Sequence, residues 1–116
     1  MMPRPQAFQT AQQDFDQLLA DIAEALDLSS RHQAYTVLES VLHAKRRRLD
    51  APQIITYAGS LPPLLAALFV QGWSVDAPTS SGPVTDAEIE ALRAAHNFAP
   101  PGAYVTVMAL IEKADG

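Results

Sequence analysis

The sequence predicts an all-α protein, a compact bundle of five to six helices that opens with an antiparallel helical hairpin. Apolar residues recur at spacings of three and four along most of the chain, which is the period of a helix with one buried face. Nine prolines divide the chain, and none of them lies between residues 6 and 51. Because proline is excluded from helix interiors, each one is expected in a loop or in a first helical turn.

The 116 residues suit one domain, with a core unit over 6–77, a linker over 74–84 and a C-terminal helical pair over 85–114. The chain has no cysteine, so a disulfide framework and a thiolate metal site are both excluded. The net charge of −5 argues against a general polyanion binder. We therefore expect no nucleic-acid partner.

The first helix is predicted over residues 6–27, where an apolar stripe runs from Phe8 to Leu26. Ser30 and Gln33 have the spacing of a capping box and predict the start of a second helix, whose apolar stripe ends at Leu49. Lys45 falls on this stripe. We expect its methylene groups to lie along the core while its ammonium group stays in water.

Asp50 is expected to cap a third helix that has Pro52 in its first turn and ends near Gly59. A fourth helix is predicted over residues 61–72, with two prolines at its start and Gly72 at its end. Residues 51–75 carry no charge, which resembles a membrane span. However, the adjacent prolines and several polar residues leave only 64–70 strictly apolar, far short of the roughly 20 residues that a bilayer requires. We expect two short buried helices and no membrane partner.

Thr85 and Glu88 form a second predicted capping box, and the helix that follows continues through Ala95 and His96. The last segment, 102–114, is ambiguous between helix and strand, because its β-branched residues favour a strand while its apolar spacing is helical. An internal similarity favours a helix. Ala34-Tyr35 and Ala103-Tyr104 each follow an amphipathic segment and a turn.

Opposite charges are concentrated in the first two predicted helices. Residues 6–28 hold five acidic side chains and no base, whereas 30–49 include the basic run from Lys45 to Arg48. In an antiparallel hairpin, Asp14 and Asp16 would come level with this run and neutralise it. A basic run in the last turn of a helix is also favoured by the helix dipole.

No residue pattern indicates a reaction. The chain has no glycine-rich phosphate loop, no nucleophile elbow and no zinc-binding His-Glu-x-x-His motif. Glu39 and His43 stand four residues apart, but a di-iron bundle requires a different spacing that occurs twice. We therefore expect a non-catalytic protein without cofactor or metal. No signal-peptide-like stretch is visible near Met1, so we expect it in the cytoplasm.

The middle of the chain, about residues 15–77, contains a recognisable series of short elements. They are, in this order, Ala34-Tyr35, Val41-Leu42-His43-Ala44, Leu61-Pro62 and Gly72-Trp73. With these elements the chain resembles the bacterial family called domain of unknown function 2267. The resemblance implies a small soluble helical protein, often built from two related helical units, with no assigned catalytic residues. The sequence departs from the family pattern at Lys45, where a leucine is usual, and at 67–71, which is usually richer in Arg, Tyr and Glu.

Two functions follow as hypotheses. In the first, the chain is an interaction or oligomerisation module that docks a protein partner or a second copy of itself, because the fourth helix has no charged face for water. The residues of this predicted surface are Leu61, Leu65, Phe69, Val70 and Trp73. In the alternative, a small molecule or an anion binds between the second and fourth helices, at a site that could also be enzymatic. The residues of this predicted site are His43, Arg46, Arg47, Tyr57 and Trp73.

Overall fold

The computed structural model describes residues 4–93 and 99–115, which contain six helices and no strand. The helices are α1 Arg4–Ala25, α2 Arg31–Arg46, α3 Ala51–Ser60, α4 Pro63–Val70, α5 Asp86–Leu92 and α6 Ala103–Asp115. The predicted all-α bundle of five to six helices is confirmed.

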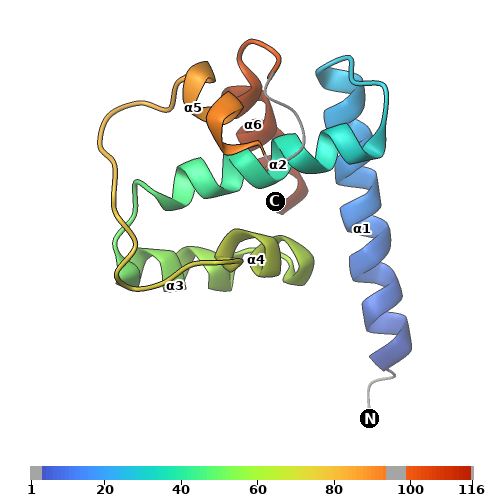
Figure 1. Cartoon of the computed structure of the whole chain (residues 1–116). Helices are drawn as coiled ribbons and strands as arrows, with labels where there is room; N and C mark the ends of the chain where they lie inside the picture. The colour runs from blue at the N-terminus through green and yellow to red at the C-terminus, as the bar shows by residue number, and fades with distance from the viewer. Residues whose placement is uncertain (1–3, 94–98, 116) are drawn as a thin grey trace.

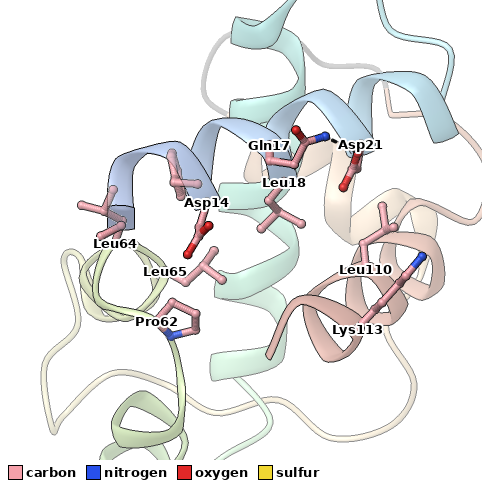
Figure 2. Close-up of a pocket in the computed structure, with 11 residues that line it drawn as sticks. Asp14, Gln17, Leu18, Asp21, Pro62, Leu64, Leu65, Leu110 and Lys113 are labelled. Atoms are coloured by element: carbon pink, nitrogen blue, oxygen red, sulfur yellow. Dashed lines mark hydrogen bonds between the residues drawn. The ribbon is translucent and has the colours of Figure 1, made fainter. Parts of the chain in front are cut away.

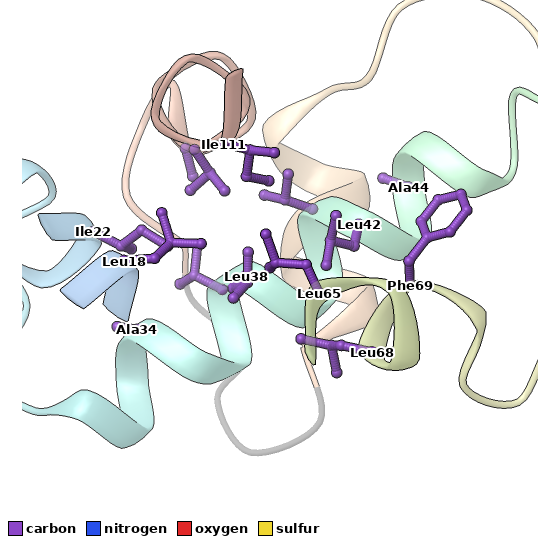
Figure 3. Packing of buried hydrophobic residues seen from close by; sticks show 14 of the residues in the cluster. Leu18, Ile22, Ala34, Leu38, Leu42, Ala44, Leu65, Leu68, Phe69 and Ile111 are labelled. Carbon is purple, nitrogen blue, oxygen red and sulfur yellow. The ribbon is translucent and has the colours of Figure 1, made fainter. Parts of the chain in front are cut away.

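Helix α2 is the centre of the bundle. It has α3 and α4 on one side, α5 and α6 on the other, and α1 across one end (Figure 1). Half of its residues are buried, and they contact side chains from the surrounding helices (Figure 3). All six helices contribute to one apolar cluster, which includes Ile22, Leu38, Ile54, Phe69, Ile89 and Ile111.

Helices α1 and α2 are joined by a short turn, as expected, but they cross at a wide angle instead of lying antiparallel (Figures 1 and 2). The turn ends α1 with Asp27 in the left-handed conformation, at φ 54°. The Leu28 N–H donates to the Ala23 carbonyl and the Asp27 N–H donates to the Glu24 carbonyl, the two bonds of a Schellman motif. The crossing carries the first half of α1 away from the basic end of α2.

Side-chain caps begin three of the helices where the sequence predicts them. Ser30 accepts a hydrogen bond from the Gln33 N–H, Asp50 from the Gln53 N–H and Thr85 from the Glu88 N–H. The full reciprocal capping box forms only at Asp50, where Gln53 also accepts from the Asp50 N–H. At Thr85 the Glu88 carboxylate does not complete the box, because it pairs with Arg47 and Arg48 instead.

The C-terminal pair completes the core. Helix α5 supplies Ile89 and α6 supplies Ala103, Val107 and Ile111, which are buried at intervals of four residues. This helical period settles the ambiguous last segment as a helix and leaves the β-branched Val105 on the outside, 73% exposed. Ala34 and Ala103 are both fully buried, in agreement with the internal similarity. Helix α5 ends at Leu92, and the predicted positions Ala95 and His96 lie outside the described residues.

The predicted linker over 74–84 contains neither helix nor strand. It passes along the end of α2, where the Ser80 N–H donates to the Arg47 carbonyl and Arg48 donates to the carbonyls of Gly82 and Pro83. None of the helices in the described residues has the length and apolar character needed to cross a membrane.

Candidate functional site

The predicted site between α2 and α4 is built around the C-terminal end of α4. The last carbonyls of a helix lack partners within the helix and carry the negative end of its dipole. Two side chains of α2 reach them. His43 Nε2 lies 3.0 Å from the Leu68 carbonyl oxygen, and Arg46 Nη1 donates to the carbonyls of Phe69 and Gln71 at 2.8 Å each.

The protonation of His43 follows from this contact. A carbonyl oxygen only accepts, so Nε2 carries the proton that it donates to Leu68. Burial lowers the pKa of His43 below its ordinary 6.5, and the Leu68 hydrogen bond opposes this in part by raising it. The charges of Arg46, which lowers the pKa, and of Glu39, which raises it, have smaller effects. Burial also lowers the pKa of the Arg46 guanidinium. Through these contacts the His43 and Arg46 side chains cap the C-terminal end of α4.

Arg47 and Arg48 point to a different element. Both form an ion pair with Glu88 of α5, Arg47 at 3.2 Å, and Arg48 contacts both carboxylate oxygens. Among the described residues, no ion pair joins these arginines to the acidic residues of α1. The predicted neutralisation by Asp14 and Asp16 is therefore replaced by Glu88, because α1 crosses α2 instead of running along it.

Tyr57 and Trp73 complete the predicted ligand site. The Tyr57 ring meets the Phe69 ring edge-on with centroids 5.0 Å apart, and Lys45 Nζ lies 5.4 Å above the Tyr57 ring. Trp73 follows Gly72, which has φ 72°, and packs half-buried against the core. The structure thus gathers His43 and Arg46 at the end of α4, places Tyr57 against Phe69, and directs Arg47 toward α5.

The residues of the predicted interaction surface divide between the buried core and the accessible surface. Leu61, Leu65 and Phe69 are buried in the core, so the chain itself covers these three residues. The outward face of α4 consists of Leu64, Ala67 and Val70, with Leu64 39% and Val70 38% exposed. An apolar face toward water does exist on α4, but of the predicted residues only Val70 and part of Trp73 belong to the accessible surface.

A cleft that the sequence does not reveal lies beside this outward face, between α1, α4 and α6 (Figure 2). Its volume is about 320 Å³, at the lower end of the roughly 300–1,000 Å³ typical of ligand clefts. Apolar side chains from all three helices line it, namely Phe15, Leu18, Leu64, Leu65 and Leu110, together with Ala11 and Pro62. Periodicity alone could have placed each of these residues on a helix, but not beside one another.

The polar groups of this cleft stand mostly on α1. Asp14, Gln17 and Asp21 line it from that helix, and Lys113 lines it from α6 (Figure 2). The Gln17 side-chain amide donates to the Asp21 carboxylate at 2.9 Å. The cleft therefore combines an apolar floor with an acidic rim on one side and a single lysine on the other.

A second hollow of about 430 Å³ lies between α2 and α3, lined by Lys45, Leu49, Pro52, Gln53, Thr56, Tyr57 and Ser60. It is wide open to solvent, and its one cation lies over the Tyr57 ring. Within the described part of the chain, no three His, Asp or Glu side chains lie together in a way that could hold a metal ion.

The family model for "Uncharacterized conserved protein (DUF2267)" matches residues 15–114. The chain belongs to this family. The DUF2267 match continues well past residue 77, where the recognisable elements end, and takes in α5 and most of α6. This range agrees with the packing, since the C-terminal pair is part of the same core. No curated protein matches the sequence.

Proposed function

We propose that this DUF2267 protein is a non-catalytic interaction module whose docking surface is the cleft between α1, α4 and α6. The observation that carries the proposal is the continuity of apolar surface from the floor of the cleft, through Leu64, onto the outward face of α4. A contiguous apolar patch bounded by charged side chains is typical of protein interaction sites. A small ligand would fill the cleft but would leave Ala67 and Val70 in water.

The other predicted site supports this choice. His43 and Arg46 already donate hydrogen bonds to carbonyls at the end of α4, and Arg47 pairs with Glu88. An anion bound there would compete with these internal contacts, whereas a partner in the cleft displaces none of them.

Copurification with a matched pair of variants tests the proposal. Leu64→Glu places a charge at the mouth of the cleft on a side chain that is already 39% exposed, so the fold is expected to survive. Val105→Glu places the same charge at an exposed apolar position of α6 that does not line the cleft. Circular dichroism first checks that both variants are folded.

We expect a partner that wild type and Val105→Glu retain and Leu64→Glu loses, and that binds again when both proteins are purified. Light scattering over a range of concentrations shows whether that partner is a second copy of the chain. Retention that is equal for all three proteins, with no concentration-dependent association, would refute a docking role for the cleft.

A further inference from the structure

We infer that the occupant of the cleft is an amphipathic helix of another protein, with basic side chains along the edge that faces α1. This inference rests on the proposed function and adds the chemistry of the partner. It follows from the shape of the floor, the charges on each wall and the way the chain uses its own basic residues.

The floor of the cleft suits the apolar side of a helix. Leu18 and Leu65 are buried at its base, while Phe15, Leu64 and Leu110 are partly accessible around them. A helix presents apolar anchors on one face at intervals of three and four residues, and such a face binds between helices without changing their backbones. A volume of about 320 Å³ accommodates a few such side chains but not a whole helix, so the partner's polar side remains in water.

The acidic side chains of α1 that line the cleft indicate that the partner is basic on the edge that faces them. Asp14 and Asp21 are both exposed and stand seven residues apart, which is a rise of roughly 10.5 Å along α1. Glu24 extends the same side of the helix by one more turn. Among the described residues, no ion pair reaches any of these three carboxylates. Basic residues two turns apart on a partner helix would face Asp14 and Asp21.

The opposite wall sets the orientation of the partner. Lys113 lines the cleft from α6, so the basic edge of the occupant is expected along α1 and a neutral or acidic edge along α6. A partner that was basic all round would meet Lys113 unfavourably.

A second copy of the chain does not fit this description. Its basic run is engaged internally, since Lys45 lies over the Tyr57 ring and Arg46 binds carbonyls of α4. Arg47 and Arg48 both pair with Glu88. Each copy also has a net charge of −5, so two copies repel each other at long range. A basic partner would instead be attracted.

Designed peptides test the inference directly. Three labelled peptides of about 18 residues are compared by fluorescence anisotropy: one with a leucine face bordered by lysines on one edge, the same peptide with glutamate for lysine, and a scrambled version of the first. Backbone amide shifts in an NMR titration show whether a peptide binds at the cleft. We expect saturable binding of the lysine peptide alone, with shifts centred on α1, Leu65 and Leu110.

Two double variants with the same charge change separate the acidic wall from net charge. Asp14→Asn with Asp21→Asn is expected to weaken binding of the lysine peptide about tenfold and to reduce its dependence on salt. Asp16→Asn with Asp76→Asn alters exposed carboxylates that do not line the cleft, and should change the affinity less than about twofold.

The possible failures are distinguishable. Equal binding of the glutamate peptide, or equal effects of the two double variants, would overturn the basic-helix inference while the cleft remained a docking site. The same holds if no peptide binds although Leu64→Glu still abolishes partner retention, or if scattering shows that a second copy fills the cleft. If Leu64→Glu has no effect on retention, the proposed function itself fails.

Discussion

Replacing Arg46 with methionine should destabilise the protein far more than the same change at its neighbour Arg47. Arg46 donates two hydrogen bonds of 2.8 Å to the Phe69 and Gln71 carbonyls at the C-terminal end of α4. Arg47 makes one ion pair to Glu88, and its side chain is 41% exposed. Methionine preserves most of the apolar stem in both cases, so the comparison isolates the charged group.

The expected loss at Arg46 follows from these contacts. A hydrogen bond from a charged donor contributes about 1.5–3 kcal/mol when partly buried, as the one to Phe69 is. The exposed bond to Gln71 and the dipole of α4 add less than about 1 kcal/mol together. We therefore expect Arg46→Met to lower the free energy of unfolding by about 2–3 kcal/mol, and Arg47→Met by less than about 1 kcal/mol.

Urea unfolding followed by circular dichroism measures both values. With an unfolding entropy of roughly 0.24 kcal/mol/K for 116 residues, the loss at Arg46 corresponds to a fall in Tm of about 8–12 °C. Arg46→Lys should recover part of the loss, since an ammonium group can still reach one carbonyl. Equal destabilisation by Arg46→Met and Arg47→Met would refute the role of Arg46 as a cap of α4.

Three further changes probe other contacts. Because the pKa of His43 is lowered in the folded state, the unfolded chain binds more protons, and the free energy of unfolding should fall as the pH drops below 6.5 until the lowered pKa is passed. Urea titrations between pH 8 and 5 should show this slope in wild type and a weaker one in His43→Gln. Thr36→Val removes the hydroxyl oxygen that accepts from buried Arg93 at 2.7 Å, and should cost about 1–3 kcal/mol in urea unfolding. Thr36→Ser, which keeps the oxygen, should cost less, and an equal cost would contradict the assignment. Asp27→Asn should stabilise the protein by about 0.5–1 kcal/mol, since asparagine suits the left-handed turn and the change removes a negative charge from the C-terminal end of α1. A lower Tm than wild type in a thermal melt would count against this reasoning.

The sequence by itself determined where α2, α3 and α5 begin, because their capping signals are local. Caps at Ser30, Asp50 and Thr85 bind N–H groups three residues away, so their spacing along the chain is enough to predict them. The apolar period of the first two helices also depends only on neighbouring turns. The last segment carried both helical and strand signals, and it was decided when burial of Val107 and Ile111 against the core favoured the helix.

The inward face of α4 could not be read from its sequence. Its eight residues, Pro63–Val70, are all apolar, so there is no polar side to contrast with the buried one. Packing against α2 selected Leu65, Leu68 and Phe69 for the core and turned Leu64 and Val70 outward. Of the residues predicted for the interaction surface, Leu65 and Phe69 therefore belong to the inward face of α4 and Val70 to its outward face.

The positions of the charges along the chain follow from the sequence, but which charges meet is decided by the tertiary structure. The sequence determines that residues 6–28 are acidic and that a basic run ends the second helix, yet which charges meet depends on the angle at which α1 and α2 cross. Glu88, forty residues beyond Arg48, became the partner because α5 packs beside α2. The crossing left Asp14 and Asp21 along a cleft that three helices enclose. Such a cleft depends on contacts between residues far apart in the chain, and a local pattern of residues does not specify them.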